Sequence, residues 1–288
     1  MNPAWRSILF VPTNVDRFVD KAHTRGADAL LLDLEDAIAP ADKESARKAL
    51  DGAIARLARG RSDIGVRINR PLDLAVRDIE AAVQPRVAFL AITKVAGAQH
   101  IRLLSELVGE LEQRRGLPLG GIRFFANVET AGAFHAMPEI ARAERVAALG
   151  IGGEDFALSL GIEPSVEAMT MPKQHVVIAA RAAGIIPLGL VGSIANFSDL
   201  EAYRSVVRRS RALGFEGASA IHPDQVRILN EEFTPAEAEV ARARALLAAA
   251  RAATQGAFAF EGRMVDKPII ERAALLIRRA DAIAARKS

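Results

Sequence analysis

The feature of this sequence that most constrains its fold is a series of eight short apolar runs separated by longer stretches with helical periodicity. Several runs are apolar at nearly every position, which is typical of strands buried on both faces of a parallel sheet. The expected strands are residues 7–11, 29–34, 64–68, 87–92, 122–128, 146–151, 185–191 and 217–221.

Helical patterns fill the stretches between these strands. Several of them end at a glycine, as a left-handed C-cap prefers. Strand-then-helix repeats in one continuous series predict a (β/α)8 TIM barrel. An open doubly wound sheet is the main alternative, and it fits less well because no Gly-x-Gly-x-x-Gly follows the first strand. The expected helices are residues 15–25, 41–59, 74–83, 98–115, 131–143, 172–183 and 200–213.

The composition changes after the eighth strand. An Ala-, Glu- and Arg-rich helix is expected over residues 235–254, an irregular or hairpin-like stretch over 255–265, and a second helix over 268–286. We therefore expect a catalytic barrel of residues 1–232. We expect residues 233–288 to form a C-terminal helical extension that acts as a lid or a subunit contact.

Composition excludes several classes of protein. The chain has no cysteine, so disulfides, cysteine-bound zinc and thiol nucleophiles are ruled out. No signal-peptide pattern opens the sequence and no apolar run is long enough to span a bilayer, so we expect a cytoplasmic protein with no membrane partner. The formal net charge is +3, the arginines are scattered, and there is one Trp and one Tyr. No nucleic-acid partner is expected from such a pattern.

Polar residues follow nearly every expected strand. Barrel active sites form at the carboxyl ends of the strands, where these side chains would converge. An ion-pair network is the alternative, but crowding so many charges at one rim is costly unless they also bind something. The residues concerned are Asp33, Glu35 and Asp36, then Arg67 and Asn69, Lys94, Glu129, Glu154 and Asp155, Ser193 and His222.

Two of these acids form the candidate metal site. Glu129 and Asp155 follow adjacent strands, so their carboxylates can meet at one point. Oxygen ligands without cysteine or clustered histidine favour Mg²⁺, with Mn²⁺ as the alternative ion. Arg67 can hold a substrate oxygen with its planar fork of donors, and the backbone of Gly152 and Gly153 can approach an anion closely.

The other polar residues have less specific roles. Lys94 is expected to act electrostatically rather than as a Schiff base, since the surrounding acids keep it protonated. Asn69 is a candidate substrate ligand, and Glu35 joins Arg67 in the candidate catalytic set. His222 could be an acid or base, or simply a buried, hydrogen-bonded histidine.

A set of motifs in the right order over nearly the whole chain resembles the citrate lyase beta-subunit-like family, within the HpcH/HpaI aldolase/citrate lyase group. The motifs are Asp33-Leu34-Glu35-Asp36-Ala37, Val66-Arg67-Ile68-Asn69, Val128-Glu129-Thr130-Ala131, Gly150 to Phe156, Ala220 to Val226, and Gly262 to Pro268.

The resemblance implies a magnesium-dependent carbon–carbon lyase that acts on acyl-CoA thioesters of citryl, citramalyl or malyl type through an enolate. By motif match, Arg67 would bind substrate oxygen and Glu129 and Asp155 would hold Mg²⁺. Asp266 would be an acid or base that reaches the site of a neighbouring subunit, in a trimer or hexamer. A malyl-CoA-type thioester hydrolase and a non-catalytic, acyl-CoA-binding or complex-forming subunit are the alternatives.

The sequence departs from the family pattern mainly near strands seven and eight. The segment 187–193 lacks the Asp that commonly follows strand seven, and Ala218-Ser219 replaces a Gly-Lys pair. A barrel tends to bind phosphate at these strands. The departures therefore bear on the acyl group and on the binding of CoA rather than on the metal site.

Overall fold

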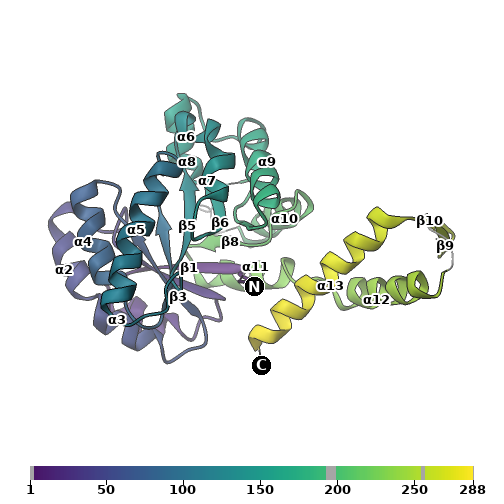
Figure 1. Ribbon diagram of the computed structural model, residues 1–288, viewed down its shortest axis with the longest axis horizontal. Coiled ribbons are helices and arrows are strands. Elements are labelled where there is room, and N and C mark those ends of the chain that lie inside the picture. The colour runs from purple at the N-terminus through teal and green to yellow at the C-terminus, as the bar shows by residue number, and fades with distance from the viewer. Residues whose placement is uncertain (1–2, 193–198, 254–256, 288) are drawn as a thin grey trace. The chain divides into compact units, whose positions relative to one another are not determined.

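Eight parallel strands form one sheet in the computed structural model, which describes residues 3–192, 199–253 and 257–287 (Figure 1). The strand order is β7-β6-β5-β4-β3-β2-β1-β8, so β8 returns to the side of β1. The strands are β1 Ser7–Pro12, β2 Ala29–Asp33, β3 Asp63–Ile68, β4 Val87–Ile92, β5 Arg123–Val128, β6 Val146–Ile151, β7 Ile186–Pro187 and β8 Ala218–Ala220.

Backbone hydrogen bonds between the segments of β7 and β8 close the sheet. The N–H of Gly189 donates to the carbonyl of Gly217 at 2.9 Å, and the N–H of Glu216 donates to the carbonyl of Pro187 at 3.1 Å. The expected (β/α)8 barrel is therefore confirmed. Strand seven is much shorter than predicted, because Pro187 has no N–H to donate and Gly189 turns the chain with a φ of 153°.

Helices follow the strands and cover the outside of the sheet (Figure 1). They are η1 Pro40–Asp42 (a 3-10 turn), α1 Asp16–Ala22, α2 Lys43–Lys48, α3 Leu50–Leu57, α4 Leu72–Ala82, α5 Ala98–Arg114, α6 Ala131–His135, α7 Met137–Arg142, α8 Gly153–Leu160, α9 Val166–Ala183, α10 Leu200–Ala212 and α11 Pro223–Glu232.

Three helical predictions need correction. The single helix expected over 41–59 is divided into η1, α2 and α3, and the one expected over 131–143 breaks at Ala136. Pro138 explains the second break, since a proline removes a helical hydrogen bond and fits only the first turn of a new helix. Pro172 lies inside α9, which begins earlier than expected because the Ser165 side chain caps its first turn. The helix α8, which follows β6 directly, was not anticipated.

Large side chains fill the interior of the barrel toward the amino ends of its strands. Trp5 packs against Phe89 with ring centroids 4.4 Å apart, and its indole N–H donates to Asp63, the first residue of β3. Gly65 makes room for the Phe89 ring, because a β carbon at that position would lie 2.3 Å from it. This packing leaves the carboxyl ends of the strands as the open end of the barrel.

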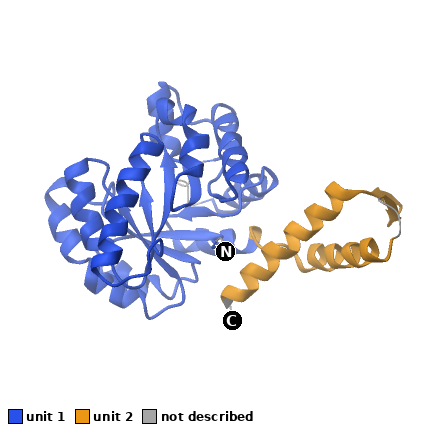
Figure 2. Cartoon of the chain, in the orientation of Figure 1, with its two compact units in different colours: residues 1–231 blue, residues 232–288 orange. Residues whose placement is uncertain are grey.

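The chain divides into two compact units, residues 1–231 and 232–288 (Figure 2). The division lies one residue before the expected boundary. The second unit consists of α12 Glu237–Ala252, a hairpin of β9 Phe258–Phe260 and β10 Arg263–Val265, and α13 Lys267–Lys287. The hairpin turns at Glu261 and Gly262, both at positive φ, as a two-residue type I′ turn requires.

Some expectations fall outside the described residues, namely Ser193 and the junction of the expected helix and hairpin at Thr254 and Gln255. Among the residues that are described, every helix is too short or too polar to cross a lipid bilayer.

Candidate active site at the carboxyl ends of the strands

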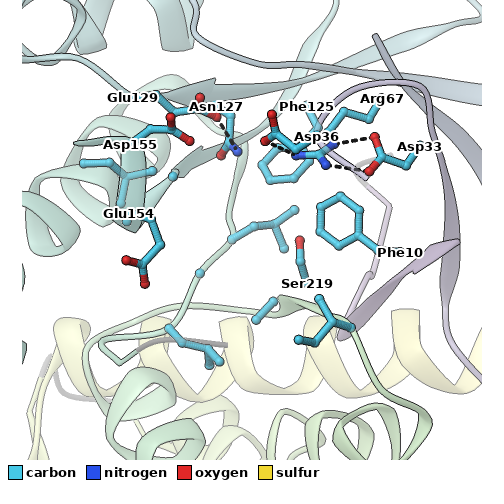
Figure 3. A pocket seen from close by; sticks show the side chains of 18 of the residues that line it. Phe10, Asp33, Asp36, Arg67, Phe125, Asn127, Glu129, Glu154, Asp155 and Ser219 are labelled. Carbon is cyan, nitrogen blue, oxygen red and sulfur yellow. Dashed lines mark hydrogen bonds and ion pairs between the residues drawn. The ribbon is translucent and has the colours of Figure 1, made fainter. Parts of the chain in front are cut away.

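A pocket of about 510 Å³ opens at the carboxyl ends of the strands (Figure 3). Its described lining includes Asp33 at the end of β2, Arg67 near the end of β3, Glu129 just after β5, and Gly152 just after β6. The parallel barrel thus brings together residues that are far apart in the sequence. This is the face on which the sequence placed the candidate site.

Arg67 is held tightly by acids of the loop after β2. Its guanidinium donates to Asp33 at 2.5 and 2.8 Å, pairs with Glu35 at 2.9 Å and Asp36 at 3.3 Å, and lies 4.8 Å above the Phe10 ring. Burial by itself lowers the pKa of Arg67, but the three carboxylates raise it above its usual value. Arg67 is therefore a fixed, permanently charged donor group in the pocket wall.

Asp33 orders the loop that carries these acids. Its carboxylate accepts the backbone N–H groups of Glu35 at 2.8 Å and Ala37 at 3.2 Å, in addition to binding Arg67. The ammonium of Lys43 donates to the carbonyl groups of Leu34 and Glu35. Lys43, the first residue of α2, therefore holds this loop in place.

Glu129 and Asp155 converge on one point beside Lys94. The Lys94 ammonium lies 3.9 Å from a Glu129 oxygen and 3.8 Å from an Asp155 oxygen, and it donates to Glu35 at 2.8 Å. Glu129 also accepts a hydrogen bond of 3.1 Å from the Asn127 side chain, and its carboxylate lies beside that of Asp155 (Figure 3). The two acids that the sequence paired are therefore brought together.

Burial and the closeness of several carboxylates shift the pKa values of Glu129, Glu35 and Lys94. Burial is the largest cause that raises the pKa of Glu129 to about 8, and the charges of Glu35 and Asp155 add to it. Burial also raises the pKa of Glu35 against the opposing effects of Arg67 and Lys94. Burial lowers the pKa of Lys94, but Glu35, Asp36 and Glu129 raise it above its usual value, which agrees with a lysine that stays protonated.

The donor set fits a hard divalent cation. Among the described residues that line the pocket, five are acidic and two are basic (Asp33, Asp36, Glu129, Glu154 and Asp155 against Arg67 and Lys173). No group of three acidic or histidine side chains in the described part of the chain could hold a metal by itself. Glu129 and Asp155 would be two protein ligands, with substrate oxygens and waters completing the shell as Mg²⁺ prefers.

Comparison with known proteins identifies the family. Residues 6–223 match the family model described as HpcH/HpaI aldolase/citrate lyase. The chain belongs to this family. It is 34% identical to an L-malyl-CoA/β-methylmalyl-CoA lyase of Cereibacter sphaeroides, over 97% of this chain and 96% of that protein. It is 32% identical to the citrate lyase subunit beta of Leuconostoc mesenteroides subsp. cremoris, over 96% and 93% of the two chains.

Solved structures agree with the barrel and its extension. CitE of Mycobacterium tuberculosis, in complex with magnesium, acetoacetate and coenzyme A, is 30% identical with a TM-score of 0.76, over 96% of this chain and 97% of that one. A citrate lyase of Burkholderia xenovorans LB400 has a TM-score of 0.84 at 18% identity, which bears on the fold alone. The resemblance inferred from the motifs is confirmed, and this citrate lyase family member is a carbon–carbon lyase.

Packing requires glycine near the end of β6, at Gly150 within the strand and at Gly152 just after it. A β carbon at Gly152 would lie 2.6 Å from the Glu129 side chain, and one at Gly150 would lie 2.8 Å from the Asn127 amide oxygen. The glycines therefore let β6 approach Glu129 and Asn127 closely. Gly153 opens α8 and also lines the pocket.

Other candidate residues are not part of the described pocket lining. Asn69 is buried, and its side-chain amide donates to the carbonyl of Leu34 and to Asp78, so it links β3 to its surroundings instead of facing a ligand. His222 is neither buried nor part of the pocket lining, and its ring accepts the N–H of Asp224 at the start of α11. Asp266 belongs to the second unit, between β10 and α13.

Two polar residues of the pocket, Asn127 and Lys173, had no role in the sequence-based prediction. Asn127 lies two residues before Glu129 on β5, and side chains two apart in a strand point to the same face. That spacing is the signal that could have found it. Lys173, on α9, lines the pocket with no motif to mark it.

Proposed function

We propose that this chain is a magnesium-dependent lyase that cleaves, or in reverse forms, a 3-hydroxyacyl-CoA thioester of citryl, citramalyl or malyl type. The carrying observation is the convergence of Glu129 and Asp155 beside Arg67 at the open end of the barrel. The names of the relatives support the substrate class, since they include malyl-CoA lyases and a citrate lyase subunit.

The proposed metal ligands are Glu129 and Asp155, with Mn²⁺ as an alternative ion. A bound Mg²⁺ would supply positive charge where negative charge develops on the carbonyl and enolate oxygens. Cleavage removes the proton of the 3-hydroxyl group and breaks the C2–C3 bond. The C3 fragment leaves as a keto acid, and the C2 fragment leaves as the enolate of a shorter acyl-CoA.

The residues of the pocket rim would orient the substrate. Arg67, immobilised by Asp33, would donate to a substrate oxygen that gains charge in the reaction. Glu35 would keep Lys94 and Arg67 in place, since it pairs with both. The backbone N–H of Gly153, the first residue of α8, would approach an anionic part of the substrate. That of Gly152, expected to do the same, instead donates to the carbonyl of Val128 at 3.0 Å.

Asp266 is the proposed acid or base that exchanges the proton at the nascent methyl carbon. Because Asp266 belongs to the second unit, we propose that it serves a neighbouring subunit in a cytoplasmic trimer or hexamer. The test is to mix two inactive variants, Asp266→Asn and Glu129→Gln. Mixed oligomers regain activity if the site is shared, whereas a mixture that stays inactive at every ratio argues for a site within one subunit.

The function is tested by incubating purified protein with Mg²⁺ and a panel of 3-hydroxyacyl-CoA thioesters, with the products identified by mass. A lyase yields a keto acid and a shorter acyl-CoA, whereas a hydrolase yields free CoA and the hydroxy acid. Turnover should stop in excess EDTA and return with Mg²⁺. Full activity in EDTA would refute the proposal, and binding without any turnover would indicate a non-catalytic subunit.

A further inference from the structure

The pocket also contains the ammonium of Lys173, which has no role in the proposed lyase reaction. Lys173 lies on α9 with its side chain 5% exposed, and its ammonium donates to the carbonyl of Gly192 at 3.3 Å. It lines the same pocket as Glu129 and Asp155. A lysine this deeply buried is uncommon unless it is paired.

Lys173 differs from the other cations of the site in its partners. Arg67 pairs with three carboxylates, and Lys94 contacts Glu35 at 2.8 Å and three further acids within 4 Å. Within the described ranges, the Gly192 carbonyl is the hydrogen-bond partner of Lys173, and no carboxylate forms an ion pair with it. A buried charge without a carboxylate in contact with it is costly, so an ammonium placed in this way is a candidate to bind an anion.

Burial dominates the electrostatics of this amine. It lowers the pKa of Lys173 to about 8, although the charge of Glu154 acts in the opposite direction. The amine therefore lacks the stabilisation that a bound carboxylate would provide.

The ammonium faces the beginning of α8. A β carbon at Gly153, the first residue of this helix, would lie 3.7 Å from the Lys173 ammonium and 4.0 Å from the end of Met169. The amino end of a helix carries partial positive charge, so a cation beside it is unfavourable unless an anion binds to both. Lys173 and the start of α8 thus offer two kinds of anion-binding group at one place.

The space between Lys173 and Gly153 lies next to Glu129, one of the two proposed metal ligands. Gly152 precedes Gly153 in the chain, and the position of its absent β carbon lies 2.6 Å from the Glu129 side chain. A ligand that reaches Lys173 therefore lies next to the part of the pocket where the carbonyl chemistry would occur. Leu188 and Leu190, which follow strand seven, add apolar lining.

We infer that Lys173 binds a carboxylate of the acid portion of the substrate, the part released as a keto acid. This inference rests on the proposed lyase function, and it adds a specificity-determining residue to it. The site would select carboxylate-bearing carbonyl compounds and disfavour neutral ones of the same shape.

The test measures binding of keto acids without turnover. Glyoxylate, pyruvate and oxaloacetate are titrated calorimetrically into wild-type protein and Lys173→Met in saturating Mg²⁺, with methyl pyruvate as the neutral counterpart. Loss of a charge-assisted contact is expected to weaken the binding of at least one keto acid by about 10-fold or more. Methyl pyruvate and free CoA should bind the two proteins equally. Glyoxylate and pyruvate carry one carboxylate and oxaloacetate carries two. A loss of affinity for all three acids would assign Lys173 to the carboxylate beside the carbonyl, and a loss for oxaloacetate alone would assign it to the second carboxylate.

Two further variants distinguish binding from a structural role. Lys173→Arg should restore most of the keto-acid affinity, because it keeps the positive charge. Lys48→Met removes an exposed lysine, 74% accessible and not part of the described pocket lining, and should leave binding unchanged. If Lys173→Met does not fold, Gly153→Ala replaces it. Its methyl group makes ordinary contacts at 3.7 and 4.0 Å, so the fold should hold while space beside the ammonium is lost.

Several results would overturn the inference. Keto acids that bind Lys173→Met as tightly as wild type, or that do not bind wild type at all, would contradict it. An equal loss of CoA affinity would indicate a phosphate contact instead, and a loss of Mg²⁺ affinity together with keto-acid affinity would indicate a structural role. Failure of the lyase function is recognised separately, as wild-type protein that binds keto acids but cleaves no thioester.

Discussion

Two buried glutamates of the barrel unit, Glu112 and Glu129, have opposite surroundings. Glu112 is 0% exposed and accepts hydrogen bonds from both terminal nitrogens of Arg145 and from the backbone N–H groups of Gly120 and Ile122. Glu129 is 4% exposed, and its hydrogen bond from Asn127 is 3.1 Å long. Burial raises the pKa of both, but the partners of Glu112 lower it below its usual value, whereas that of Glu129 rises to about 8.

The difference separates a structural ion pair from a binding site. Glu112 and Arg145 satisfy each other, and Arg6 with Asp28 forms a similar short pair outside the pocket. Glu129 shares its surroundings with other acids, and its cation partner Lys94 lies 3.9 Å away, whereas Arg145 lies 2.8 Å from Glu112. A buried acid whose ionised form is destabilised in this way is typical of a site that binds a positively charged ligand.

The largest expected effect is the loss of catalytic activity when Glu129 is substituted. Glu129→Gln should lower kcat/KM by about 10³-fold or more, because one of two proposed metal ligands is lost. Its free energy of unfolding without metal should not fall, since glutamine resembles the protonated acid. Enzyme kinetics and urea unfolding measure the two quantities. A marked loss of stability with retained activity would show that Glu129 is structural.

The matched change at Glu112 should have the reverse outcome. Glu112→Gln leaves the Arg145 charge buried without its partner, which is expected to reduce the free energy of unfolding by about 3–5 kcal/mol. Activity per folded molecule should stay the same, because Glu112 lies outside the pocket lining. Urea unfolding and an active-site-normalised assay check this. Lost activity in protein that is fully folded would contradict it.

Metal binding should sharpen the contrast further. Mg²⁺ at about 100 times its dissociation constant should stabilise the wild-type protein by about 2.7 kcal/mol, because it binds the folded state selectively. Glu129→Gln and Asp155→Asn should show no such gain, whereas Glu112→Gln should keep it. Thermal unfolding with Mg²⁺ and with EDTA tests this, and an equal gain in all variants would place the ion elsewhere.

Lys173 extends the comparison to a buried base and has the smallest expected effect. Its pKa of about 8 lies below the ordinary 10.5, so below pH 8 folding buries an unfavourable charge. Lys173→Met should therefore raise the free energy of unfolding at pH 7 by about 1–3 kcal/mol. Between pH 8 and 10.5 the unfolded wild-type chain binds more protons than the folded one. The free energy of unfolding of the wild type therefore rises with pH, and its difference from the variant shrinks. A destabilised variant at pH 7 would identify Lys173 as a structural residue.

The sequence by itself determined the barrel and the family. Strands buried on both faces are marked by short, nearly continuous apolar runs, and β4 and β6 were predicted at the bounds that the structure shows. The pairing of Glu129 with Asp155 also followed from the sequence. Neighbouring parallel strands deliver the residues after them to one edge, whatever the details of packing.

Tertiary structure alone decided which polar side chains face the pocket. Asn69 and His222 follow strands as Glu129 does, yet Asp78 and Asp224 engage them elsewhere. Lys173 comes from the middle of a helix and reaches the pocket only because α9 packs against the start of α8 and the segment at Gly192. Local periodicity specifies the face of an element, but the end point of a long side chain depends on contacts between distant segments, and no local pattern encodes those contacts.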